Sequence, residues 1–325
     1  MKASCYDCVS MRARSLLSLW VLAGAVGCGT TGAGTGNPFA DAGNVSHDAT
    51  PDTGARKLAS DSGTLPTGDA TAPSGDASVP SDCADGTDLV YVVSSSDNSL
   101  YSFYPPTLAF TKVGVLACDS MTSPFAMSVA RDGYAWVNYD DGQVFRVSLK
   151  DATCSATGFT PGQHGFTTFG MGFSANATGS SAETLFVCWT QGLAQIDTTS
   201  LVLTPVGTMP GLDITSGCDL TGNGAGALFS FITQPTQWTL AQLDKVTSGP
   251  MWQRSLTPPI PAGGAWGTSF WGGDLYLYTA PTGNSIVWRY RPSDQTTVQL
   301  VSDVGFTIVG AGESTCVPTT APPPK

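Results

Sequence analysis

The chain has 325 residues and a formal net charge of −11, with 38 Gly and 22 Pro. So much Gly and Pro excludes a protein built from long helices, and the plentiful Thr, Val and aromatic residues favour β-strands. Residues 28–82 hold two basic and seven acidic residues, and residues 83–325 hold nine basic and 17 acidic residues, which gives −5 and −8. Both parts would be repelled by a phosphate backbone, so nucleic acid is not an expected partner.

The first 27 residues have the pattern of a secretory signal peptide. Met11–Arg14 is basic, and Ser15–Gly27 is a short apolar run that ends in small residues. This run is too short for a transmembrane helix, which needs about 20 residues. We therefore expect residues 1–27 to be removed during export.

Ala25–Cys28 follows directly and resembles the lipobox of bacterial lipoproteins. The resemblance implies that Cys28 becomes the mature N-terminus and carries a lipid that anchors the protein to the outer membrane or cell surface. Ala25 differs from the Leu that is most common in that family. The alternative is ordinary cleavage after Ala23–Ala25, which would release a soluble periplasmic or extracellular protein.

Residues 28–82 consist mainly of Gly, Thr, Ala, Ser, Asp and Pro. Such a segment cannot bury enough apolar surface to offset the entropy of ordering, so we expect a disordered tether. It leads to a domain at residues 83–318, which a Pro-rich tail follows at residues 319–325.

Five short runs of hydrophobic and aromatic residues recur in the domain at intervals of 43–50 residues: Leu89–Val93, Ala135–Tyr139, Leu185–Trp189, Leu228–Ile232 and Leu275–Thr279. A turn and a second strand follow each run, so each predicts a β-hairpin. Most hairpins are followed by a polar strand. Most are also preceded by a segment of small and hydrophobic residues: Pro124–Ala130, Thr168–Phe173, Ala265–Phe270 and, before the fourth hairpin, Leu212–Ile214 or Cys218–Leu220.

Four strands in each unit of about 46 residues predict the blade of a β-propeller. Leu89–Val93 has no segment before it, and the last segment, Gly305–Gly310, has no hairpin after it. Joined together they complete one blade, so the expected fold is an all-β, five-bladed β-propeller. A large β-sandwich is the alternative, but it explains the regular spacing less well.

Gly272–Tyr276 with Trp288 resembles a kelch repeat, and Asp132–Trp136 resembles blades of the NHL and YVTN type. Each match occurs in one unit only. The tether and blades together resemble the propeller lipoproteins of Gram-negative bacteria. That resemblance implies a surface location without naming a ligand.

The domain contains six cysteines, and an even number in an exported protein predicts disulfides, with 15 possible connectivities. The blade register favours one bridge within the closing blade, one that flanks the second repeat, and one that joins the third hairpin to the next unit. These are Cys83–Cys316, Cys118–Cys154 and Cys188–Cys218.

Few residues in the domain are candidates for catalysis. His164 is its only histidine and lies in a turn-like segment, so a His-based triad or metal site is not expected. Asp213, Asp219 and Glu313 lie in or near the predicted inner segments. Paired carboxylates there could serve a glycosidase.

A second set of oxygen ligands, Asp213, Asp219 and Asn223, lies in a Gly-rich stretch. A structural Ca²⁺ at these residues is the one cofactor hypothesis, although the stretch lacks the spacing of an EF-hand. Trp238 lies in a predicted turn and is expected to be the most exposed tryptophan of the domain.

The sequence therefore predicts a monomeric cell-envelope lipoprotein whose propeller binds a glycan, peptide or protein partner without catalysis. The alternative is an exported carbohydrate-active hydrolase or lyase that uses carboxylates near the propeller axis. Three acids converging at the axis would favour the enzyme, and an aromatic or polar lining would favour the binding protein.

Overall fold

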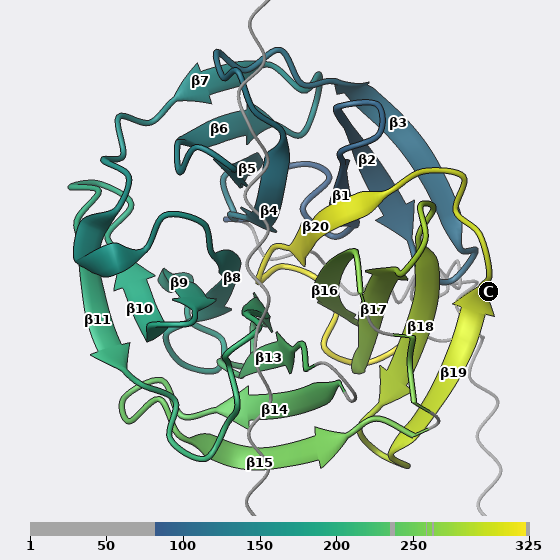
Figure 1. The fold of residues 1–325 in the computed structure, drawn as a ribbon. Helices are drawn as coiled ribbons and strands as arrows, with labels where there is room; N and C mark the ends of the chain where they lie inside the picture. Colours follow the sequence, from purple (N-terminus) through teal and green to yellow (C-terminus); the bar gives the residue numbers. More distant parts are fainter. Residues whose placement is uncertain (1–81, 235–237, 258, 262, 323–325) are drawn as a thin grey trace, which may run out of the picture. The chain divides into compact units, whose positions relative to one another are not determined.

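The computed structural model describes residues 82–322, apart from 235–237, 258 and 262. The signal peptide, Cys28, nearly all of the tether and the end of the tail lie outside the described residues. Twenty strands in the described part form five four-stranded antiparallel sheets arranged as a ring (Figure 1). The five-bladed propeller expected from the sequence spacing is confirmed.

The first two blades hold the first seven strands and the last one. Blade 1 consists, from the axis outward, of β20 (Ile308–Glu313), β1 (Val90–Ser94), β2 (Ser99–Tyr104) and β3 (Ala109–Val115). Blade 2 consists of β4 (Pro124–Val129), β5 (Tyr134–Tyr139), β6 (Val144–Ser148) and β7 (Cys154–Ala156).

The other three blades follow in chain order. Blade 3 consists of β8 (Gly170–Ala175), β9 (Glu183–Trp189), β10 (Gly192–Ile196) and β11 (Leu203–Gly207), with a short 3-10 turn, η1 (Gln163–Gly165), before it. Blade 4 consists of β12 (Cys218–Gly222), β13 (Leu228–Ile232), β14 (Thr239–Leu243) and β15 (Pro250–Ser255). Blade 5 consists of β16 (Ala265–Trp271), β17 (Asp274–Ala280), β18 (Ile286–Arg291) and β19 (Thr296–Val301).

Blade 1 closes the ring with strands from both ends of the domain. Strand β20 pairs antiparallel with β1, with Val90 opposite Glu313 and Val92 opposite Ala311. The predicted completion of one blade from two distant segments is therefore correct. Of the two candidates for the inner strand of blade 4, the structure uses the one that begins at Cys218.

The inner strands β20, β4, β8, β12 and β16 contact one another in this order around the axis. Their small residues permit the close approach. A Cβ atom on Gly310 would lie 2.7 Å from the Cα of Ala126, and one on Gly172 would lie 2.9 Å from the carbonyl carbon of Leu220. Side chains larger than hydrogen at these positions would push neighbouring blades apart.

The apolar core of the described residues is divided among four clusters that lie between neighbouring blades. The outer strands are largely exposed, as in β3 and β15, whereas β13 and β17 are buried throughout. Each blade therefore buries the two faces of its central strands against the two neighbouring blades, which explains why these strands are almost wholly apolar in sequence.

Three disulfides join the expected cysteine pairs, Cys83–Cys316, Cys118–Cys154 and Cys188–Cys218. Disulfides are typical of proteins that fold outside a reducing cytoplasm, so they support export of this chain. The part of the chain that the structure describes contains no helix long and apolar enough to cross a membrane.

Candidate binding pocket at the end of the propeller axis

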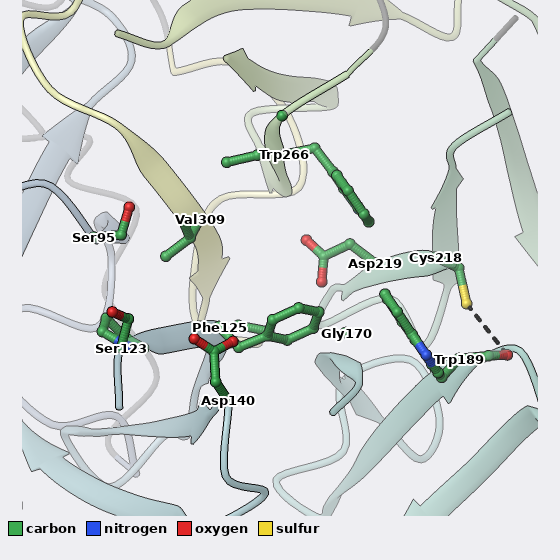
Figure 2. A pocket seen from close by; sticks show the side chains of 14 residues that line it. Ser95, Ser123, Phe125, Asp140, Gly170, Trp189, Cys218, Asp219, Trp266 and Val309 are labelled. Atoms are coloured by element: carbon green, nitrogen blue, oxygen red, sulfur yellow. Dashed lines mark hydrogen bonds between the residues drawn. The ribbon is translucent and has the colours of Figure 1, made fainter. Parts of the chain in front are cut away.

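A pocket of about 340 Å³ lies where the inner strands begin. All five blades contribute to it. Its lining residues lie at or directly before the starts of the inner strands, at the end of β9, or directly after β1 and β5: Ser95, Ser123, Pro124, Phe125, Ala126, Asp140, Gly170, Trp189, Cys218, Asp219, Gly264, Ala265, Trp266 and Val309 (Figure 2). This volume is within the usual range of small-molecule pockets.

Three partly exposed aromatic side chains form much of the pocket wall. The rings of Trp189 and Trp266 are parallel, with 6.3 Å between centroids and 1° between planes. The Phe125 ring meets Trp189 edge to face at 5.3 Å. Figure 2 shows the two indole rings in parallel, with the Asp219 carboxyl group drawn to one side of them. The pocket thus offers flat apolar surface beside a carboxyl group.

The positions of these aromatic residues are fixed by the packing around them. Gly217 adopts a φ of 101°, and a Cβ atom there would lie 2.5 Å from the Trp189 ring, so only glycine leaves room for this indole. The Cys188–Cys218 bridge joins the residue before Trp189 to the residue before Asp219. Figure 2 marks a contact of 3.9 Å between Cys218 Sγ and the Trp189 carbonyl oxygen.

Trp238 supports the wall from behind. It is 1% exposed, stacks on Phe231 at 4.6 Å and meets Trp266 edge to face at 6.1 Å. The prediction that Trp238 is the most exposed tryptophan is wrong. Trp238 directly precedes β14, and burying its large apolar ring against Phe231 and the next blade outweighs the exposed location that the sequence suggested.

Asp219 is the most unusual polar residue of the pocket. It is 2% exposed, and the Thr268 amide donates a hydrogen bond to its Oδ2 at 2.8 Å. Its Oδ1 has no partner with hydrogen-bond geometry among the described residues. Burial raises the pKa of Asp219 well above its usual range, although the nearby amides of Thr268, Leu220 and Met171 favour the charged form.

Asp140 lies at the outer part of the same pocket and is exposed. Its amide donates to the Ser123 carbonyl oxygen at 3.0 Å, which ties together two loops that line the pocket. Partial burial of the carboxyl group, followed by repulsion from Asp141, raises the pKa of Asp140. The pocket therefore carries two carboxyl groups, one near solvent and one deeply buried.

Glu313 lies in the closed centre of the ring and does not line the pocket. The Thr221 hydroxyl donates to Glu313 Oε1 between β12 and β20, which belong to non-adjacent blades. Burial raises the pKa of Glu313 well above its usual range, and Asp219 adds a repulsive contribution. This contact joins blades 4 and 1 across the axis.

The remaining candidate residues have local structural roles. Asp213 is exposed and accepts hydrogen bonds from the amide and hydroxyl of Thr215, while Asn223 accepts from the amides of Ala225 and Ala227. His164 is exposed in η1 with a φ of 51°. Of the acids Asp213, Asp219 and Glu313, only Asp219 lines the pocket.

This arrangement does not support the calcium hypothesis, because the side chains of Asp213 and Asn223 each accept hydrogen bonds from amides two residues ahead in the chain. Within the described ranges, no group of three His, Cys, Asp or Glu residues is placed to hold a metal ion.

A second cavity, of about 460 Å³, lies near the other ends of β4 and β8. Its charged residues are already paired with one another. Arg131 bonds Asp82 at 2.8 Å and Thr315 at 3.0 Å, and Glu183 accepts from the Arg131 amide and the Thr315 hydroxyl. These contacts join both ends of the domain to blades 2 and 3, so they favour a structural role.

Sequence reasoning missed Trp189, Trp266, Phe125 and Asp140 as pocket residues. The available signal was their place in the repeat. Each lies at the beginning of an inner segment or the end of a hairpin's first strand, and in a propeller these positions meet at one end of the axis.

Comparison with known proteins identifies no family for this chain. No family model and no curated protein matches it. Solved structures match at low identity. The extracellular domain of the one-component system BT4673 from B. thetaiotaomicron is 14% identical over 67% of this chain, with a TM-score of 0.37. TolB from Acinetobacter baumannii is 11% identical over 66%, with a TM-score of 0.41.

The Dos1 propeller is 11% identical, covers 72% of both chains and has a TM-score of 0.39. The present chain spans only 27% of the BT4673 domain and 52% of TolB. The assignment of five blades therefore rests on the strand topology of this chain itself.

Proposed function

We propose that this chain is an exported, non-catalytic binding protein whose propeller takes its ligand in the pocket at the start of the inner strands. The observation that carries the proposal is the partly exposed aromatic wall of Trp189, Trp266 and Phe125 in a pocket to which every blade contributes. The disulfide and the glycine beside Trp189 hold this wall in place before any ligand arrives, which lowers the entropic cost of binding.

The proposal includes a lipid on Cys28 that anchors the protein to the outer membrane or cell surface. The lipobox-like Ala25–Cys28 supports it, and the three disulfides support the export that lipidation requires. The soluble periplasmic or extracellular protein is the alternative. The ligand classes are a glycan, a peptide or a protein partner, bound by a monomer.

Intact mass spectrometry of protein purified from its native membrane tests the anchor. We expect a diacyl or triacyl adduct on Cys28, and a gain of about six daltons on reduction because three disulfides each take up two hydrogens. A soluble species that begins at Val26 would contradict the anchor. A smaller gain on reduction would contradict the set of three bridges.

Binding is tested by tryptophan fluorescence, because Trp189 and Trp266 lie in the pocket wall. Glycans, peptides and small polar metabolites are titrated against the mature protein and against Trp266→Ala. A ligand of this pocket should quench the tryptophan fluorescence of the intact protein and should bind the variant less tightly. Binding that the substitution leaves unchanged would place the ligand elsewhere and contradict the proposal.

A hydrolase or lyase remains the second candidate because Asp140 and Asp219 both line the pocket and both have raised pKa values. The same glycans are therefore analysed for new reducing ends or unsaturated products after incubation. Binding without products is the expected result. Product formation that Asp219→Asn abolishes would instead establish the enzyme.

A further inference from the structure

We propose that the ligand of this pocket is an alkylammonium cation, that is, a positively charged nitrogen that carries apolar substituents. This inference rests on the proposed function and names its ligand class. The argument uses the charge of the lining, the aromatic wall, the buried Asp219 carboxyl group and the size of the cavity.

The charged side chains that line the pocket are all acidic. They are Asp140 and Asp219, and no Lys, Arg or His is among the described lining residues. Residues 83–325 carry a net charge of −8, so the domain as a whole attracts cations and repels anions. An anionic ligand would have to enter this pocket without a counter-charge, and we therefore exclude it.

The aromatic wall matches the apolar substituents of such a cation. Trp189 and Trp266 present partly exposed rings, and Phe125 adds a third. The face of an aromatic ring carries negative potential, and Trp is the strongest of the three aromatic residues in binding ammonium groups. Clusters of aromatic rings are the usual sites that recognise methylated ammonium ions, and a carboxyl group adds ionic attraction.

Asp219 supports a cationic ligand independently of the aromatic wall. Its side chain is almost wholly buried and lines the pocket, and its Oδ1 has no partner with hydrogen-bond geometry among the described residues, although the Leu220 and Met171 amides lie nearby. Burying a carboxyl oxygen without a partner costs free energy, and the attraction of a cation in the pocket would offset that cost. Figure 2 labels this carboxyl group in the same pocket as the Trp266 and Trp189 side chains, and all three line it.

Two other ligand classes fit the lining less well. A sugar needs donors as well as acceptors for its hydroxyl groups, yet apart from the Ser95 and Ser123 hydroxyls and the indole N–H groups the polar side chains here are carboxyl groups. A bare metal ion needs several ligands at one point, and among the described residues no three His, Cys, Asp or Glu side chains are placed to hold one.

The cavity also limits the size of the ligand. Its volume of about 340 Å³ is at the lower end of the usual range for small-molecule pockets. A trimethylammonium group on a short chain fits this volume. The same chemistry occurs in a free amine, in a lysine side chain of a peptide and in the choline headgroup of a lipid, and the experiment separates these sources.

The test is a calorimetric and fluorescence titration of the mature protein with choline, with its neutral carbon isostere dimethylbutanol, and with a panel of neutral sugars. We expect choline to bind at least about tenfold more tightly than the isostere, because only choline carries a charge that the aromatic faces and the carboxyl groups attract. Parallel titrations with Nα-acetyl-lysine amide, whose side-chain ammonium group is free, and with phosphatidylcholine vesicles identify the source that binds best.

Variants assign the binding to this pocket. Trp266→Ala should weaken choline binding by about 2- to 30-fold, and Trp266→Phe should weaken it less because an aromatic face remains. Asp219→Asn keeps an acceptor for the Thr268 amide but removes the charge, and it should cost about tenfold. Asp119→Asn removes a charge from an exposed residue outside the pocket lining and should change nothing beyond a small long-range effect.

These results distinguish failure of the cation inference from failure of the proposed binding function. Equal binding of choline and its isostere, or equal effects of Asp219→Asn and Asp119→Asn, would overturn the cation inference. Binding of a sugar in place of choline, weakened by Trp266→Ala, would also overturn it while the pocket remains the binding site. If no ligand of either kind responds to Trp266→Ala while circular dichroism shows the variant folded, the proposed function itself fails.

Discussion

Asp219 shows how far a single residue could be interpreted from the sequence. Its position in an inner segment marked it as a candidate for catalysis or Ca²⁺ binding, and its place beside the axis was correctly predicted. Its burial, its bond to Thr268 and its contact with the pocket depend on how β12 packs against β16 and β8. None of these neighbours is close to Asp219 in the sequence.

The raised pKa of Asp219 predicts a specific pH dependence of stability. In the unfolded chain this carboxyl group ionises at a lower pH than in the folded protein. Its contribution to stability is therefore fully present below the unfolded pKa and is lost as pH rises towards the folded pKa. We expect Asp219→Asn to reduce the loss of stability between pH 4 and pH 8, measured as the urea midpoint at each pH.

Asp213→Asn is the matched control for this experiment. The hydrogen bonds from the Thr215 side chain and amide lower the pKa of Asp213, so its contribution has the opposite sign and is lost as pH falls. Because the pKa of Asp213 lies at or below about 3.8 in both states, its contribution changes only below about pH 4, so Asp213→Asn should leave the slope of stability between pH 4 and pH 8 unchanged. A slope that Asp219→Asn leaves unchanged would contradict the burial argument.

At the scale of elements, strand positions were predictable and side-chain exposure was less so. The hairpins and inner segments appear close to their expected positions because alternation, turn residues and a repeat of about 46 residues are local signals. The prediction that Trp238 is exposed was wrong, because Trp266, which covers it from the neighbouring blade, lies far from it in the sequence.

Two of the disulfides allow a direct comparison of their contributions to stability. Cys188–Cys218 and Cys118–Cys154 close loops of similar length, with sequence separations of 30 and 36 residues. The chain-entropy model therefore gives each about 3–4 kcal/mol of stability. Replacing either pair by alanines should lower the free energy of unfolding by similar amounts, measured by urea unfolding.

Only one of these replacements should affect the pocket. Cys188 and Cys218 are neighbours of Trp189 and Asp219, whereas Cys118 and Cys154 join blade 2 to the loop before it. We expect the Cys188→Ala, Cys218→Ala protein to bind the pocket ligand less tightly, with the other double variant unchanged. Equal effects on binding would show that the first bridge does not position the pocket.

For the whole molecule, the decisive feature is closure of the ring by β20 and β1. Without this pairing blade 1 would lack its inner strand, and β1 would expose an unpaired edge. The Cys83–Cys316 bridge closes a separation of 233 residues next to this pairing, and Arg131 and Glu183 add contacts on the same side.

Replacing Cys83 and Cys316 by serine should therefore destabilise the propeller by about 5–6 kcal/mol in the chain-entropy model. We expect amide hydrogen exchange to accelerate first in β1 and β20, because local opening begins where closure is weakened. Uniform acceleration in all five blades would instead show that the ring opens as one unit and that the closing blade has no special role.

The sequence by itself determined the number of blades, the closing blade and the three cysteine pairs. These features follow from local alternation, a regular spacing and the register that this spacing imposes. The tertiary structure alone decided that Trp189, Trp266, Phe125 and Asp219 form one pocket. These residues come from four separate repeats, and only ring closure brings the starts of the inner strands together around the axis.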